Sequence, residues 1–167
     1  MLARIRFASF VAACTVISTS LLGCVQQPVM RIGPFPAEQY QDISLDGNST
    51  VVGQLFMRTL SGDVKYGAGS RVYLMPVTDY SRRLEAANAR GARVPDYDPR
   101  VEQFSRIVQA DGEGRFTFKK VAAGNYLVGG QVMWYRPSGF GPLPEGGFIM
   151  KEVTVAEGQE ATVMVTR

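Results

Sequence analysis

Apolar and polar residues alternate along most of the chain after residue 48, and this period of two constrains the fold more than any other feature. Alternation over short runs that end in Gly, Asp or Ser predicts half-buried antiparallel strands. Seven such runs are predicted, at residues 50–60, 71–78, 104–110, 116–118, 124–135, 148–155 and 160–166, the last two as a terminal pair. Seven short strands within roughly 120 residues indicate an all-β fold, a seven-stranded antiparallel β-sandwich.

A long connection separates the second and third of these strands. Residues 80–90, YSRRLEAANAR, are rich in helix formers and end at Gly91, a residue typical of helix termini. The helix start is predicted at one of two polar caps, Asp79 or Ser81. Asp98-Pro99 favours a further helical turn. The excursion over residues 79–103 is therefore a helical insertion, and long connections of this kind are often functional.

Residues 24–47 lack a sustained helix or strand period. Pro28, Pro34 and Pro36 bias the backbone towards extended conformations and interrupt strand pairing. This segment is predicted to be a flexible tether before a folded domain at residues 48–167. The alternative is an edge strand around Ile43 and Leu45.

The first 23 residues have the pattern of an export signal. Arg4 and Arg6 precede a mostly apolar run at residues 7–22 that Ser and Thr interrupt. Such a run is poor at spanning a bilayer core of about 30 Å, but it is typical of a signal peptide. The prediction is a signal peptide at residues 1–23.

Leu21-Leu22-Gly23-Cys24 resembles the lipobox of bacterial lipoproteins. The resemblance implies cleavage before Cys24, lipidation of its thiol and acylation, for example by palmitate, of the new amine. No aspartate follows Cys24, and by similarity to enteric lipoproteins this implies the outer membrane, facing the periplasm. Two alternatives are an uncleaved transmembrane anchor and an ordinary cleaved signal with a free product.

Composition excludes several function classes. The chain contains no histidine, which removes Ser-His-Asp triads and His-rich zinc sites. Its two cysteines are Cys14 and Cys24, so a cleaved and lipidated chain has no free thiol. Without Arg4 and Arg6, basic and acidic side chains are almost equal in number, which disfavours nucleic-acid binding. We therefore predict no catalytic residues, no metal site and no cofactor.

The stretch Ala110–Val128, ADGEGRFTFKKVAAGNYLV, resembles the signature of carboxypeptidase regulatory-like domains. The positions that match the pattern are Asp111, Gly114, Phe116, Phe118, Val121, Gly124 and Tyr126. The resemblance implies a prealbumin-like (transthyretin-like) sandwich, whose members are usually non-catalytic accessory modules. Independently, Phe116 and Phe118 share one strand face, and the Tyr126 hydroxyl can reach back to the backbone as in a tyrosine corner.

Aromatic residues gather in the irregular segments. Tyrosine and tryptophan are enriched at binding hot spots, so residues 79–103 and a loop at 134–147 are predicted to form a partner-binding surface. Its candidate residues are Tyr80, Tyr97, Trp134, Tyr135 and Phe140. The alternative is that these rings only cover the end of the sandwich.

These features together predict a non-enzymatic protein, lipid-anchored in the cell envelope, that binds a protein or a glycan. One alternative is a secretion-machine component similar to the type VI secretion lipoprotein. Another is a hydrolase similar to the hydroxyisourate hydrolases, but those use histidines and a C-terminal Tyr-Arg-Gly-Ser, whereas this chain ends Val165-Thr166-Arg167.

Overall fold

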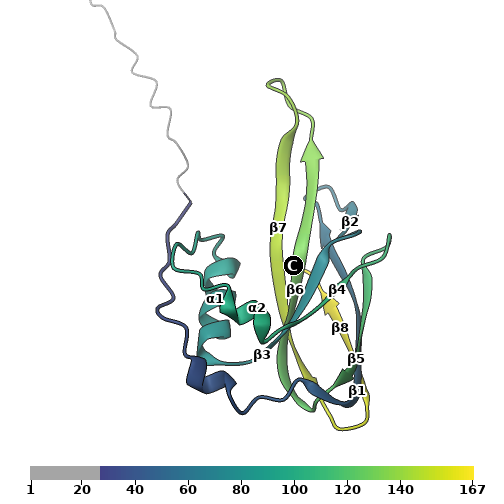
Figure 1. Cartoon of the computed structure of the whole chain (residues 1–167). Coiled ribbons are helices and arrows are strands. Elements are labelled where there is room, and N and C mark those ends of the chain that lie inside the picture. Colours follow the sequence, from purple (N-terminus) through teal and green to yellow (C-terminus); the bar gives the residue numbers. More distant parts are fainter. Residues whose placement is uncertain (1–26) are drawn as a thin grey trace, which may run out of the picture.

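The computed structural model describes residues 27–167, which form two four-stranded sheets and a helical layer (Figure 1). The first sheet contains β1 (Asp46–Arg58), β2 (Val64–Tyr66), β5 (Arg115–Val121) and β8 (Glu160–Val165). The second contains β3 (Arg71–Pro76), β4 (Arg106–Gln109), β6 (Gly124–Arg136) and β7 (Leu143–Val155). The helices are η1 (Ala37–Tyr40), α1 (Asp79–Ala89) and α2 (Arg100–Gln103). The all-β sandwich predicted from the sequence is confirmed.

The strand count and one strand direction differ from the prediction. The described residues form eight strands rather than seven, because the short β2 pairs with the end of β1. In the first sheet β1 pairs with all three other strands, and its pairing with β8 is parallel. The sheet is therefore not purely antiparallel. The second sheet, in the order β4-β3-β6-β7, is antiparallel throughout.

The last two strands were predicted to pair with each other, and this is wrong. β7 pairs with β6, whereas β8 crosses to the first sheet and pairs with β1. Hydrogen bonds hold the intervening turn against the start of β1. The Ser49 hydroxyl donates to the Ala156 carbonyl at 2.8 Å, and the Gly158 N–H donates to Asn48 Oδ1 at 2.8 Å. These contacts join residues more than 100 positions apart in the sequence, so the local alternation pattern could not predict them.

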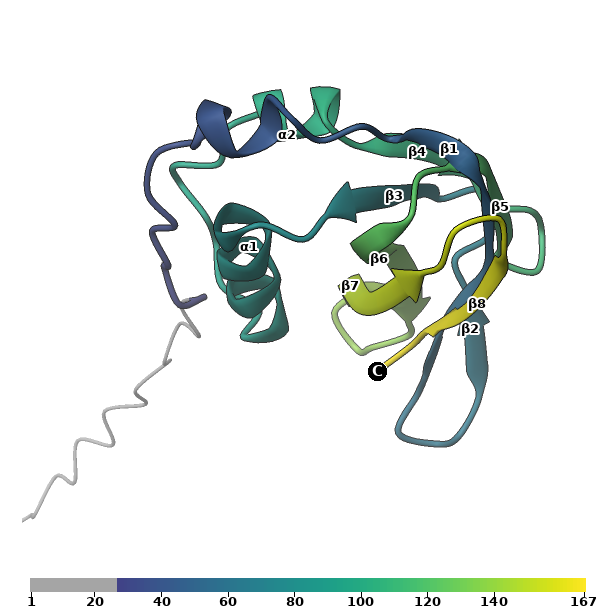
Figure 2. The same cartoon turned by 90° about the horizontal axis from the view of Figure 1, so that it is seen from below.

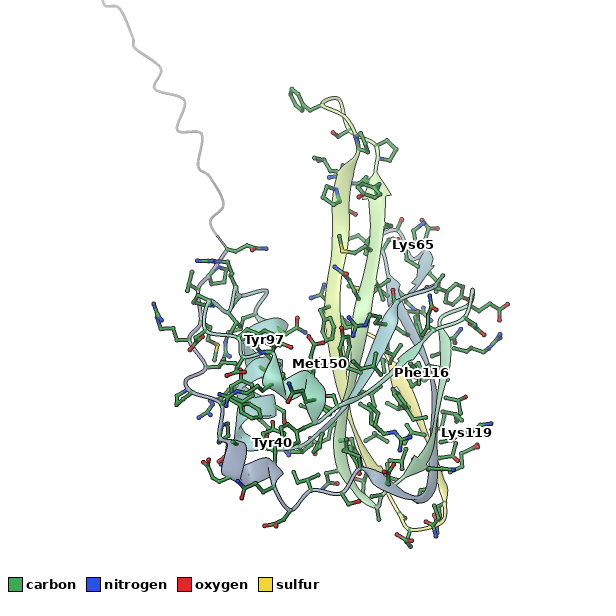
Figure 3. The ribbon with its side chains drawn as sticks, viewed as in Figure 1. Tyr40, Lys65, Tyr97, Phe116, Lys119 and Met150 are labelled. Carbon is green, nitrogen blue, oxygen red and sulfur yellow. The ribbon has the colours of Figure 1, made fainter. Side chains whose placement is uncertain are left out.

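The main core lies between the two sheets and contains the alternating residues that the sequence predicted to face inwards. Phe116 and Phe118 both point into it, with ring centroids 5.7 Å apart (Figure 3 labels Phe116). Burial of each ring contributes about 2 kcal/mol. The Tyr126 hydroxyl donates to the Ala122 carbonyl at 2.9 Å, so the predicted tyrosine corner is confirmed. Burial raises the pKa of Tyr126, which keeps this donor protonated.

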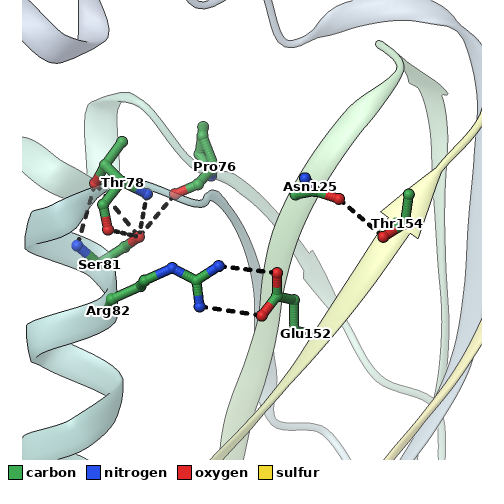
Figure 4. Close-up of polar contacts among 7 residues, drawn as sticks. All are labelled: Pro76, Thr78, Ser81, Arg82, Asn125, Glu152 and Thr154. Atoms are coloured by element: carbon green, nitrogen blue, oxygen red, sulfur yellow. Dashed lines mark hydrogen bonds and ion pairs between the residues drawn. The ribbon is translucent and has the colours of Figure 1, made fainter.

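The helical insertion lies between β3 and β4, as predicted, but its cap is Thr78 rather than Asp79 or Ser81. Thr78 Oγ1 accepts a hydrogen bond from the Ser81 N–H at 3.1 Å, and Ser81 Oγ accepts one from the Thr78 N–H at 2.8 Å (Figure 4). This reciprocal pair is a capping box. Arg82 binds Glu152 of β7 through two 3.1 Å contacts, which tie α1 to the second sheet (Figure 4).

The predicted flexible tether is wrong for the described part of that segment. Ile32, Phe35 and Tyr40 are at most 7% exposed and pack with the helical insertion in a second core. The Phe35 ring stacks on Tyr40 at 4.8 Å and meets Tyr80 edge-on at 5.4 Å. Figure 2 shows the segment and α1 as a third layer beside the second sheet. A segment without a helix or strand period can still bury irregularly spaced side chains, as Ile32, Phe35 and Tyr40 do.

Neither Ile43 nor Leu45 lies in an edge strand, so that alternative is not found either. Both are half-buried, Ile43 against the second core and Leu45 against the main core.

No helix within residues 27–167 is long and apolar enough to cross a bilayer.

The Asp96 carboxylate holds the N-terminal segment on the insertion. It accepts the N–H groups of Ile32 at 3.1 and 3.2 Å and of Gly33 at 2.9 Å. Desolvation acts to raise the pKa of Asp96, but the hydrogen bonds from Gly33 and Ile32 outweigh it and bring the pKa below its usual value. Ionised Asp96 therefore stabilises the docked segment.

An Asp96→Ala variant is expected to lose this docking. Because docking lowers the pKa of the Asp96 carboxyl, the ionised carboxylate stabilises the docked form fully at pH values above about 4, the ordinary aspartate pKa. This stabilisation is lost as the pH falls through the lowered pKa of Asp96. Hydrogen exchange should show the Ile32 and Gly33 amides losing protection roughly tenfold or more in the variant. The wild-type protein should show the same loss only in acid. Asp42→Ala, at an exposed carboxylate of the same segment, is the control; equal protection in both variants would contradict the role of Asp96.

Candidate functional site

A hollow of about 240 Å³ lies between the helical insertion and the outer face of the second sheet. Strands β3 and β7 provide one wall, while α1 and the segment after it provide the other. Figure 3 shows Tyr97 and Met150 on opposite sides of this space. The lining residues are Tyr73, Met75, Leu84, Asn88, Ala92, Val94, Tyr97, Glu102, Phe148 and Met150.

Two aromatic rings, Tyr73 of β3 and Phe148 of β7, meet across the intervening strand β6 in the lining of the hollow. The Tyr73 and Phe148 ring centroids lie 5.9 Å apart, with the rings tilted by 53°. Gly129 of β6 stands opposite both Tyr73 and Met150 in the strand register. A Cβ at position 129 would lie 2.8 Å from Phe148 Cε1 and 2.7 Å from Met150 Cγ. The absence of a side chain at Gly129 therefore leaves the space in which Phe148 and Met150 pack over β6.

Hydrogen-bonding groups border the rings. Tyr97 donates its hydroxyl to Glu102 Oε1 at 3.1 Å, and Glu102 also lies 3.7 Å from Arg71. The Arg71 guanidinium sits 5.2 Å from the centre of the Tyr73 ring, within cation–π range. Burial, and then the Glu102 charge, raise the pKa of Tyr97, so it remains a neutral donor at physiological pH. Asn88 donates to the Phe148 carbonyl at 2.9 Å.

A second hollow of about 260 Å³ adjoins the first and shares Tyr73 and Phe148 with it. Its other lining residues are Ser70, Arg71 and Gln131. The two hollows with the shared ring pair are called the sheet-two groove below. The groove offers aromatic faces between polar groups, which suits a ligand that has both an apolar face and hydroxyl groups. Among the described residues, no three His, Cys, Asp or Glu side chains are grouped to hold a metal ion.

The sequence-predicted site residues do not form one surface. Tyr97 lines the sheet-two groove and is 39% exposed. Tyr80 is completely buried, and its hydroxyl accepts the Asp98 N–H at 2.9 Å, so its assignment to a binding surface is wrong. The physical reason is that the inner side of α1 must cover the second core, and Tyr80 lies on that side.

The other three predicted residues belong to a different part of the molecule. Residues 134–147 are not a loop, because β6 runs to Arg136 and β7 starts at Leu143. Trp134 is half-buried against the main core and donates to Glu145 Oε2 at 3.0 Å. Tyr135 and Phe140 are 71% and 102% exposed towards the end of this long hairpin. No residue of 134–147 lines the first hollow; the β7 residues that do so, Phe148 and Met150, lie beyond this range.

Tyr73 and Phe148 were not predicted as site residues. The alternation did place Tyr73 on the strand face opposite Val72 and Leu74, which is where the structure has it. What the sequence could not supply is the partner strand, since Phe148 is 75 positions away. The sequence signal that could have indicated this site is an outward-facing tyrosine, Tyr73, together with the Gly129-Gly130 pair on a later strand.

Comparison with known proteins shows a similarity to a solved structure. No family model matches the chain, and no curated protein matches it. Among solved structures, the fold is similar to that of a protein from Pseudomonas aeruginosa described as a "putative carbohydrate binding protein". The TM-score is 0.69 and the sequence identity 29%, over 81% of this chain and 99% of that one. The similarity thus spans nearly the whole length of the other protein.

Proposed function

We propose that this protein is a non-enzymatic carbohydrate-binding module, anchored by lipid in the cell envelope, that holds a glycan in the sheet-two groove. The observation that carries the proposal is the Tyr73–Phe148 ring pair, open between two hollows and bordered by hydrogen-bonding groups. The similar Pseudomonas aeruginosa structure supports the same class of ligand.

The chemistry of a sugar ring fits this arrangement. A pyranose has a face of C–H groups that packs on an aromatic ring, and hydroxyls at its edge that need hydrogen-bond partners. Tyr73 and Phe148 offer the aromatic faces. Arg71 and Gln131, which line the second hollow, and Glu102, which lines the first, offer donors and acceptors for the hydroxyls. Because two hollows flank the ring pair, an oligosaccharide suits the groove better than a single sugar.

The location and family are part of the proposal. Leu21-Leu22-Gly23-Cys24 supports a lipid anchor at Cys24, on the outer membrane facing the periplasm. The Asp111–Tyr126 pattern and the Tyr126 corner support a relationship to carboxypeptidase regulatory-like, prealbumin-like domains. An anchored module of this kind would hold an envelope glycan close to the membrane.

The groove is tested by calorimetry against a panel of neutral and acidic envelope oligosaccharides. We expect Tyr73→Ala and Phe148→Ala each to weaken binding of the best ligand at least about tenfold. The loss of a hot-spot aromatic side chain costs about 2 kcal/mol or more, and about 1.4 kcal/mol is a factor of ten in affinity. Gln131→Ala, which removes only a rim group, should have a smaller effect.

The matched control is Tyr66→Ala, because Tyr66 is a 45% exposed tyrosine on β2 of the other sheet. It should bind like the wild-type protein. Circular dichroism establishes that each variant is folded. Binding that is unchanged in folded Tyr73→Ala and Phe148→Ala, or a panel with no ligand at all, would count against the groove as a glycan site.

A further inference from the structure

The β6–β7 hairpin carries exposed apolar side chains to its tip. β6 and β7 pair without interruption from Gly124↔Val155 to Arg136↔Leu143, so the hairpin is ordered along its whole length. It projects beyond the rest of both sheets (Figure 1). Phe140 in the turn is fully exposed, at 102%, and Tyr135 and Leu143 beside it are 71% and 42% exposed. A group of exposed apolar side chains at the end of a projecting hairpin is a candidate contact surface.

Several polar groups near this tip are paired with each other. Ser138 Oγ donates to the Gly141 carbonyl at 2.5 Å and accepts the Phe140 N–H at 3.2 Å. Arg136 lies 2.5 Å from Glu145, so the charges of this pair offset each other. Pro137 and Pro142 have no N–H to satisfy. A turn with few unpaired polar groups can enter a water-poor environment at low cost.

The number of residues between Cys24 and the first folded residue limits the distance between the folded domain and a lipid on Cys24. The Pro28 carbonyl already accepts the Arg93 N–H at 2.8 Å. Only four peptide steps separate Cys24 from Pro28, which gives a reach of about 14 Å at most. The first described residues and the hairpin turn both lie in the upper part of the molecule in Figure 1. A bilayer that holds the Cys24 lipid is therefore close to the end of the molecule from which the hairpin projects.

We propose that the tip of the β6–β7 hairpin inserts into the interfacial region of the same bilayer, with Phe140 at the boundary between headgroups and acyl chains and Tyr135 among the headgroups. The occupant of this surface is a lipid bilayer rather than a protein, because the short connection to Cys24 brings the bilayer to it. Aromatic side chains favour this interfacial region. The inference rests on the lipid anchor of the proposed function. Two points of contact would fix the orientation of the sheet-two groove relative to the membrane.

The test uses the full-length lipidated protein in vesicles of phosphatidylethanolamine and phosphatidylglycerol that contain brominated phosphatidylcholine. The chain has one tryptophan, Trp134, so the wild-type signal is a simple background. In Phe140→Trp, the added fluorescence is expected to be quenched at least about twofold by the brominated acyl chains and shifted to the blue, as expected for a residue at the acyl boundary. Because position 140 is fully exposed, the exchange leaves the fold intact.

The matched control is Lys119→Trp, an exposed position on β5 at the opposite end of the molecule (Figure 3). Its added fluorescence should be unquenched. Equal quenching at positions 119 and 140, or no quenching at 140, would overturn the hairpin contact while the anchor stands. Crosslinking of position 140 to an envelope protein in place of lipid would do the same. Mass spectrometry that finds no lipid on Cys24 would instead overturn the anchor and, with it, this inference.

Discussion

Replacing Tyr80 by alanine is expected to destabilise the protein by about 3–5 kcal/mol, the range for truncating a large buried aromatic side chain. The Tyr80 side chain is completely buried in the second core and meets the Phe35 ring edge-on at 5.4 Å. Its hydroxyl also accepts the Asp98 N–H at 2.9 Å. The truncation therefore leaves a cavity where α1, the N-terminal segment and the α2 region meet.

Tyr80→Phe separates the two contributions of this side chain. It keeps the ring but leaves the Asp98 N–H without its acceptor, which is expected to cost about 1–2 kcal/mol. Tyr97→Ala, at the exposed tyrosine of the same insertion, should cost less than Tyr80→Ala. Urea unfolding followed by circular dichroism measures all three. A loss below about 1 kcal/mol in Tyr80→Ala would mean that the second core unfolds separately from the sandwich.

The sandwich could be predicted because its evidence is local. In β3, Val72 and Leu74 face the main core and Tyr73 faces outwards, as the alternation predicted. The Tyr126 corner was likewise predictable, since its hydroxyl bonds to a carbonyl only four residues earlier. Each of these features depends on neighbours within a few positions of the chain.

The third layer could not be predicted for the opposite reason. Ile32 and Phe35 have no helix or strand period, and Asp96, which holds the backbone of this segment, is over 60 residues away. The same limit applies to the groove, whose ring pair joins β3 to β7. Aromatic composition indicated both Tyr97, which lines the groove, and Tyr80, which is buried, because composition does not distinguish the inner side of a helix from its outer side.

Replacing Cys24 by serine is expected to release the protein from the membrane completely. The oxygen of serine does not replace the thiol that the lipobox pattern assigns to lipid attachment. Each buried methylene contributes about 0.8 kcal/mol, so two or three acyl chains hold a protein durably, whereas the hairpin tip alone would bind only weakly and reversibly. Labelled palmitate should enter the wild-type protein and not Cys24→Ser, which should move to the soluble periplasmic fraction. Cys14→Ser is the matched control and should behave like the wild-type protein.

The anchor and the groove should fail independently of each other. Cys24→Ser leaves Tyr73 and Phe148 untouched, so oligosaccharide affinity is expected to stay within about twofold of the wild-type value, as for distant sites that do not couple. Tyr73→Ala should show the reverse, with normal palmitate labelling and membrane fractionation but weakened glycan binding. Labelled palmitate in Cys24→Ser, or unchanged fractionation of that variant, contradicts the anchor. Glycan affinity that falls with release from the membrane would instead mean that the bilayer itself contributes to the binding site.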